Sequence, residues 1–127
     1  MSPKRILLAD DDCLMTHVLR LKMEEAGYVV DTVRDGIEGL ERARKSPPDM
    51  IITDLQMPGM DGYCFACALR EDPATSSVPI VLLTGRGHKL SKQQIAGSGI
   101  VKVVPKPFSA REILSIVQSQ IGTETAA

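Results

Sequence analysis

The stretch ILLADDDCLM, residues 6–15, decides how the rest of the chain is interpreted. Four apolar residues typical of a buried strand run directly into three aspartates, and an apolar pattern resumes after them. Neighbouring carboxylates repel one another, and some would be protonated unless a cation or another fixed partner kept them ionised. This stretch alone leaves two interpretations open. Either one aspartate caps the next helix while the others are solvated, or the carboxylates bind a metal ion.

The composition is that of an ordinary globular domain. The 127 residues are 43% hydrophobic and 24% charged, with a formal net charge of −1, so no basic field indicates nucleic acid or anionic lipid as a partner. No apolar run approaches the ~20 residues that span a bilayer, and no signal peptide is expected. Three cysteines, an odd number, are typical of a reducing compartment, so we expect a cytoplasmic protein.

Short apolar runs alternate with helix-length amphipathic patterns over one expected domain, residues 1–127, with its core over about 4–121 and a frayed tail over 122–127. The runs predict strands at Ile6–Ala9, Val29–Val33, Met50–Thr53, Pro79–Leu83 and Val101–Val104. Apolar stripes predict four helices, with core-facing residues Leu14, Val18 and Leu21; Ile37 and Leu40; Phe65 and Leu69; and Ile113, Ile116, Val117 and Ile121. A short further helix is expected within Leu90–Ala96.

Strands that alternate with helices predict an α/β fold with a parallel sheet covered on both faces. Asp35 with Glu38, and Ser109 with Glu112, have capping-box spacing and indicate two helix starts. In such sheets ligands gather at the carboxyl ends of the strands. The polar residues that we therefore expect at one rim are Asp10, Asp11, Asp12, Asp54, Thr84 and Lys106.

This rim would contain the groups that phosphoryl transfer requires. Two or more aspartates suit Mg²⁺, which needs one or two carboxylates and keeps waters that a phosphate can replace. Asp54, alone at its strand end, is a candidate nucleophile toward phosphorus. Lys106 can offset charge on the phosphoryl oxygens, and Thr84 can donate a hydrogen bond to them.

These motifs closely resemble the receiver domain of two-component response regulators. The matching segments are the three aspartates after the first strand, IITDLQMPGMDG at 51–62, LLT at 82–84 and KPF at 106–108, and the resemblance covers about residues 4–120. It implies a flavodoxin-like (βα)5 sandwich with sheet order 2-1-3-4-5. It also implies a signalling phosphoprotein that catalyses only its own phosphorylation and dephosphorylation, rather than an enzyme with a separate substrate.

The resemblance implies a role for each rim residue. Asp10, Asp11 and Asp54, with the backbone carbonyl of Gln56, would hold Mg²⁺, and Asp12 would be the capping residue. Asp54 would accept a phosphoryl group from a histidine kinase or a histidine phosphotransfer protein.

Two further positions complete the implied site. Thr84 resembles the switch hydroxyl, and Lys106 resembles the lysine that contacts phosphate, next to a cis bond to Pro107. The phosphorylated domain would signal to a downstream protein, without binding nucleic acid or membrane, and a homodimer is left open.

Three features depart from the family pattern or lie outside it. Val103 stands where receivers usually have an aromatic residue that moves with the switch hydroxyl. Either this is a simple core substitution and the loop after Thr84 carries the switch, or the output is muted or read on another face. Arg86 and His88, between two glycines and a lysine, are expected to be solvated. Cys64 and Cys67 have CxxC spacing but no second pair, so we expect inert thiols, with a partner contact on that helix face as the alternative.

Three other functions compete with this interpretation. A haloacid-dehalogenase-type phosphatase also uses an aspartate and Mg²⁺, but the expected Thr or Val after the second acid is missing and the chain has no room for a cap domain. A nucleotide-binding module would need a glycine-rich loop after the first strand, which is absent. The closest alternative is a pseudo-receiver, a scaffold that binds partners without being phosphorylated, which Val103 favours and the intact rim opposes.

Overall fold

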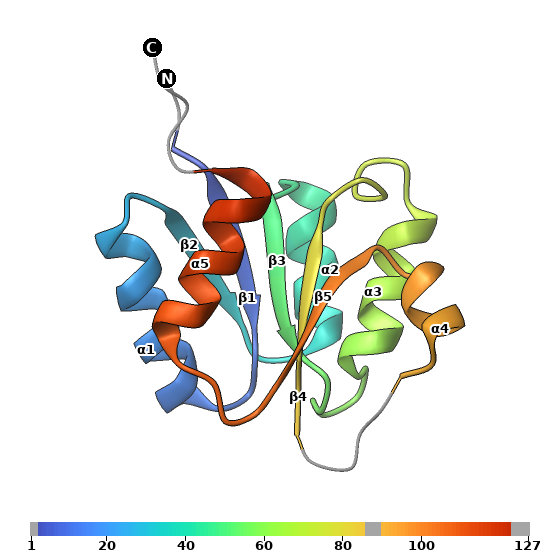
Figure 1. Cartoon of the computed structure of the whole chain (residues 1–127). Helices are drawn as coiled ribbons and strands as arrows, with labels where there is room; N and C mark the ends of the chain where they lie inside the picture. Colours follow the sequence, from blue (N-terminus) through green and yellow to red (C-terminus); the bar gives the residue numbers. More distant parts are fainter. Residues whose placement is uncertain (1–2, 86–89, 123–127) are drawn as a thin grey trace.

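The computed structural model describes residues 3–85 and 90–122, which form one sheet of five strands and five surrounding helices (Figure 1). The strands are β1 (Arg5–Ala9), β2 (Val29–Val33), β3 (Met50–Asp54), β4 (Ile80–Thr84) and β5 (Ile100–Pro105). The helices are α1 (Cys13–Glu25), α2 (Gly36–Lys45), α3 (Gly62–Glu71), α4 (Lys92–Ala96) and α5 (Ala110–Ile121). Strands and helices alternate along the chain, as the sequence predicts. Within the described ranges, no helix has both the length and the apolar character needed to cross a bilayer.

The sheet is parallel throughout, and its strands lie in the order β2-β1-β3-β4-β5. The predicted flavodoxin-like order is therefore confirmed. The carboxyl ends of the strands meet at one edge, the lower edge in Figure 1. β3 and β4 each extend one residue beyond the predicted strand, so Asp54 and Thr84 are the last residues of their strands and not the first residues of loops.

Each face of the sheet has its own apolar core. Helices α1 and α5 cover one face, where Met23, Ile113 and Val117 are fully buried. Helices α2, α3 and α4 cover the other, where Phe65 and Leu69 are fully buried. The predicted core-facing residues of α3 are thus confirmed, as are the four of α5, two of them fully and two partly buried.

The predicted core-facing stripe of α1 is wrong. Leu14, Val18 and Leu21 are 74%, 45% and 50% exposed, and we call these three residues the α1 outer stripe. The residues that pack on the sheet are Leu19 and Met23, both fully buried. Helix α1 carries two apolar stripes at helical spacing, and periodicity alone does not tell which of two stripes faces the core.

Helix α2 also differs from expectation, because it packs through small residues. Ile37 is 55% exposed, whereas Gly36, Gly39 and Ala43 are buried. A Cβ atom on Gly39 would lie 2.8 Å from Cζ of Phe65, so only glycine allows α2 to approach α3 this closely. Leu40 is partly buried against this core, as predicted.

Side-chain caps fix the helix starts. Asp35 Oδ1 accepts a hydrogen bond from the Glu38 N–H at 2.8 Å, and Ser109 Oγ accepts one from the Glu112 N–H at 3.0 Å. Both predicted helix starts are therefore confirmed. The Glu38 carboxylate accepts a hydrogen bond from the N–H of Arg34 and not from that of Asp35, the capping residue. Helix α4 has a complete capping box, in which Ser91 and Gln94 hydrogen bond reciprocally.

Candidate functional site

Three carboxylates meet at the carboxyl edge of the sheet. Asp10 and Asp11 follow β1, and Asp54 ends β3, two strands that are adjacent and in register. One carboxylate oxygen from each residue lies within 4.8 Å of the other two. The sequence prediction that these acids gather at one rim is confirmed, and the set of hard oxygen ligands suits a divalent cation.

Asp10 is the most buried of the three acids, with 2% of its surface exposed. Its Oδ1 accepts a hydrogen bond from the Asp12 N–H at 2.9 Å, but its Oδ2 is buried and has no partner in the described structure. Burial raises the pKa of Asp10 to about 6, against the effect of that hydrogen bond and with a further increase from the charge of Asp54. A buried oxygen left without a partner is the position at which a cation would fit.

Asp12 has a different role from its two neighbours. Its Oδ1 accepts hydrogen bonds from the N–H groups of Leu14 at 3.0 Å and Met15 at 3.2 Å, so Asp12 caps α1. The stretch of residues 6–15 therefore contains both features that its sequence left open: Asp10 and Asp11 belong to the acidic cluster, and Asp12 caps the next helix.

Lys106 provides a positive charge next to Asp54 of the acidic cluster. Its Nζ lies 2.9 Å from Oδ1 of Asp54, and the peptide bond between Lys106 and Pro107 is cis, as the resemblance implies. Burial lowers the pKa of Lys106, but hydrogen bonding to Asp54 and the charges of Asp54 and Asp10 outweigh this effect and raise it. The ammonium therefore stays charged near neutral pH.

Thr84 completes the rim from the neighbouring strand. It is 4% exposed at the end of β4, next to β3 and its last residue, Asp54. The Thr84 carbonyl accepts a hydrogen bond from the Lys106 N–H at 2.7 Å. The backbone thus ties the two chain segments that carry the hydroxyl and the ammonium to each other.

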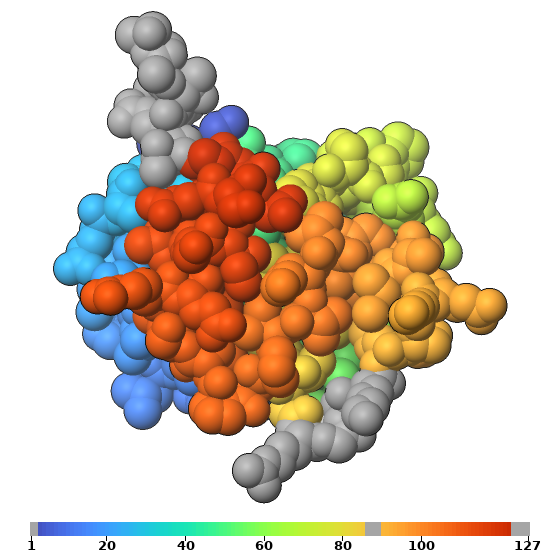
Figure 2. Space-filling model, in the orientation of Figure 1, coloured from blue at the N-terminus to red at the C-terminus, as the bar shows by residue number. Residues whose placement is uncertain are grey.

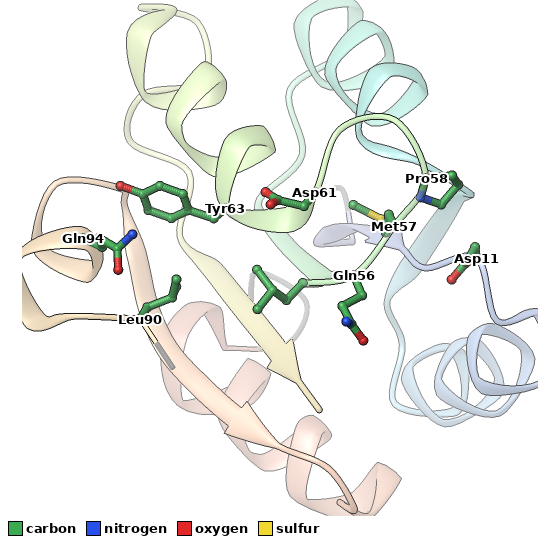
Figure 3. A pocket seen from close by; sticks show the side chains of 9 residues that line it. Asp11, Gln56, Met57, Pro58, Asp61, Tyr63, Leu90 and Gln94 are labelled. Atoms are coloured by element: carbon green, nitrogen blue, oxygen red, sulfur yellow. The ribbon is translucent and has the colours of Figure 1, made fainter. Parts of the chain in front are cut away.

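A cavity of about 690 Å³ extends from Asp11 of the acidic cluster to residues of α3 and α4. Figure 3 shows Asp11 and Gln56 at one end of it, and Tyr63 reaching toward Leu90 and Gln94 at the other. Sequence reasoning missed this cavity, because its lining comes from three separate segments and follows no pattern along the chain. The role of the Gln56 carbonyl as a metal ligand stays a prediction.

The remaining candidates lie outside this cluster. Val103 is partly buried in the core that α3 and α4 cover, as a simple core substitution would be. Arg86 and His88 lie outside the described residues. Cys64 is exposed and Cys67 half-buried on the outer side of α3.

Comparison with known proteins agrees with this geometry. The family model for the response regulator receiver domain matches residues 6–118. The chain is 36% identical over 115 residues to the DNA-binding dual master transcriptional regulator RpaA of Synechocystis sp., an alignment that covers 91% of this chain and 48% of RpaA. The chain spans about half the length of RpaA and of the next two relatives, PhoB of Rhizobium meliloti and ResD of Bacillus subtilis.

Solved structures give the same result. The chemotaxis response regulator CheY4 of Vibrio cholerae superposes with a TM-score of 0.83 at 32% identity, covering 91% of this chain and 97% of CheY4. The receiver domain of the sensor histidine kinase PA1611 from Pseudomonas aeruginosa, with a magnesium ion coordinated in its active site cleft, superposes with a TM-score of 0.84 at 29% identity, covering 95% and 99%. With this sheet, this acidic edge and these relatives, the chain belongs to the receiver domain family of two-component response regulators.

Proposed function

We propose that Asp54 accepts a phosphoryl group from the phosphohistidine of a histidine kinase or a histidine phosphotransfer protein, in a reaction that requires Mg²⁺. One observation carries this proposal: three carboxylates have oxygens within 4.8 Å of one another, and an ammonium lies 2.9 Å from Oδ1 of one of them, Asp54. A site of this kind can hold a divalent ion and a cluster of anionic oxygens side by side.

Asp10, Asp11 and Asp54 would hold the ion, with the Gln56 carbonyl as a further ligand. The unpartnered Oδ2 of Asp10 and the all-oxygen donor set support this assignment. The PA1611 receiver domain, which has magnesium in its cleft, supports it by similarity. When bound, Mg²⁺ supplies positive charge that offsets the charge on the phosphoryl oxygens.

The chemical step is a displacement at phosphorus. An oxygen of Asp54 forms the new P–O bond as the P–N bond of the donor breaks, and the electron pair of that bond goes to the imidazole nitrogen. The Lys106 ammonium, which contacts Asp54 before transfer, offsets charge on the incoming phosphoryl oxygens. Thr84, buried at the neighbouring strand end, donates a hydrogen bond from its hydroxyl to another of these oxygens.

The donor protein would dock on the α1 outer stripe. Leu14, at one end of this stripe, is three residues from Asp11 of the acidic cluster, and its side chain is largely exposed. An exposed apolar stripe beside a reaction site is typical of a partner contact. The phosphorylated domain would in turn act on a downstream protein. The net charge of −1 supports contact with protein rather than direct contact with nucleic acid.

Intact-mass spectrometry after incubation with acetyl phosphate tests the proposal. With Mg²⁺ the wild type should gain about 80 Da, the mass of one phosphoryl group. The gain should disappear in excess EDTA and in Asp54→Asn. The matched control is Asp12→Asn, which keeps a good helix cap outside the acidic cluster and should be labelled like the wild type. A folded wild type that gains no mass with Mg²⁺ would contradict the proposal and indicate a pseudo-receiver.

A further inference from the structure

Helix α3 presents two thiols about one turn apart that the proposed phosphoryl transfer does not use. Cys64 is exposed and Cys67 half-buried, and both are free thiols. The two residues between them, Phe65 and Ala66, are fully buried in the core. Residues three apart are neighbours on a helix surface, so the two sulfur atoms share one side of α3.

The backbone and the neighbouring polar groups hold the thiol pair in place. Asp61 Oδ1 accepts a hydrogen bond from the Cys64 N–H at 2.8 Å and so caps α3. Hydrogen bonding to Asp61 also raises the pKa of the Cys64 thiol, which makes it a poor nucleophile near neutral pH. The Tyr63 hydroxyl hydrogen bonds with the Cys67 thiol, which raises the pKa of Tyr63.

The helix geometry disfavours a disulfide between these thiols. Side chains three apart on a helix have Cβ atoms about 5–6 Å apart, whereas a disulfide needs about 3.5–4.5 Å. Closing that gap would unwind the first turns of α3, against the Asp61 cap and the burial of Phe65 and Ala66. A metal ion bridges a wider gap: two metal–sulfur bonds of about 2.3 Å allow sulfur atoms up to roughly 4.6 Å apart.

The surroundings favour an ion that two sulfur ligands satisfy. A structural zinc site takes four protein ligands. In the described part of the chain, the only group of three or more His, Cys, Asp or Glu ligand atoms within 4.8 Å of one another is the Asp10, Asp11 and Asp54 cluster. The thiol pair therefore has no compact third ligand of these types, and a soft ion of low coordination number fits it best.

We propose that Cys64 and Cys67 form a two-thiolate site for a soft metal ion, with Cu(I) as the biological ion that this ligand set matches. Binding breaks two S–H bonds, releases two protons and forms two S–Cu bonds, and no electron is transferred. The site lies on the outer side of α3, apart from the acidic cluster, and does not depend on phosphorylation of Asp54.

Competition with a coloured Cu(I) chelator, under reducing and oxygen-free conditions, measures this binding. The wild type should remove one Cu(I) per chain, and Cys64→Ser and Cys67→Ser should each weaken binding at least a hundredfold. Cys13→Ser, which removes the third and exposed thiol, is the matched control and should bind like the wild type. Circular dichroism checks that each variant is folded.

Tyrosine emission gives an independent reading of the same site. The chain has no tryptophan and two tyrosines, and Tyr28 is buried in the opposite core. Cu(I) should therefore change the emission of Tyr63, and Tyr63→Phe should lose that change while still binding the ion. The proposal is overturned if Cys64→Ser binds as tightly as the wild type, if Cys13→Ser loses binding equally, or if the wild type takes up no Cu(I).

Discussion

The carboxyl edge of the sheet and the outer side of α1 break the ordinary rule of burial in opposite ways. At the edge, Asp10 and Asp54 are buried although they are acids, and on α1 the outer stripe is exposed although it is apolar. Burying charged groups costs folding free energy because they lose hydration. The exposed apolar stripe contributes little to folding, because its surface stays in water. We propose that the edge binds ions and that the stripe is covered by the phosphoryl donor protein.

The largest expected effect is on the rate of phosphorylation, through Lys106→Ala. Removing the ammonium that contacts Asp54 takes away charge compensation at the reacting oxygens, so labelling by acetyl phosphate should slow about 10²–10³-fold. The rate of mass gain measures this. Lys102→Ala removes an exposed lysine of β5 and is the control. If Lys106→Ala is labelled within threefold of the wild-type rate, the ammonium has no part in the reaction.

A second pair of variants compares the two apolar stripes of α1. Leu19→Ala empties a fully buried position and should lower the free energy of unfolding by about 2–5 kcal/mol. Leu14→Ala, on the outer stripe, should change it by no more than about 0.5 kcal/mol. Urea unfolding measures both. If Leu14→Ala is as destabilising as Leu19→Ala, the outer stripe is part of the core.

The same stripe provides a functional comparison. Leu14→Ala combined with Leu21→Ala should slow transfer from a phosphohistidine donor about tenfold or more, the effect of losing ~1.4 kcal/mol of contact. Labelling by acetyl phosphate, which needs no docking surface, should be unchanged. If both reactions slow equally, the substitutions disturb the acidic site itself and the stripe is not the docking surface of the donor.

Asp10→Asn is expected to raise the free energy of unfolding, whereas Leu19→Ala lowers it, and the change should be smaller. Since the pKa of Asp10 rises from 3.8 to about 6 on folding, this group favours the fold most below about pH 4. That contribution is lost as the pH rises through about 6. The difference corresponds to at most roughly 3 kcal/mol, so Asp10→Asn should stabilise the magnesium-free protein at pH 7.5 by about 1–3 kcal/mol.

Magnesium makes this comparison sharper. Mg²⁺ should raise the unfolding midpoint of the wild type, because an ion that binds only the folded state stabilises it. It should have little effect on Asp10→Asn, which lacks a ligand. Urea unfolding with and without Mg²⁺ measures both effects. Destabilisation by Asp10→Asn in EDTA, or full protection of this variant by Mg²⁺, would contradict the assigned role of Asp10.

Most of the fold and of the site could be predicted from the sequence, because both depend on strand ends. Strand residues alternate with helical patterns at short spacing, and a parallel sheet brings the ends of its strands to one edge. Asp10, Asp54 and Lys106 follow or end separate strands, so their proximity could be predicted without knowing how the helices pack on the sheet. The capping role of Asp12, which the resemblance implied, is confirmed by its hydrogen bonds at the start of α1.

Packing details could not be predicted in the same way. Helix α1 has two apolar stripes with equivalent spacing, and only the position of α5 and the sheet decides that Leu19 faces inward. Helix α2 is buried through Gly36 and Gly39, which a hydrophobic pattern does not mark. The cavity between Gln56 and Gln94 depends on where α4 lies relative to α3, and no local sequence pattern encodes that position.

Borohydride reduction of the phosphorylated protein tests the central claim most directly, because it converts an aspartyl phosphate into homoserine at the modified position. The tryptic peptide of residues 46–70 contains Asp49, Asp54 and Asp61, and tandem mass spectrometry distinguishes them. After incubation with Mg²⁺ and a phosphohistidine donor, the account predicts homoserine at position 54 alone. Homoserine at position 49 or 61, or an unreduced peptide after phosphorylation, would contradict it.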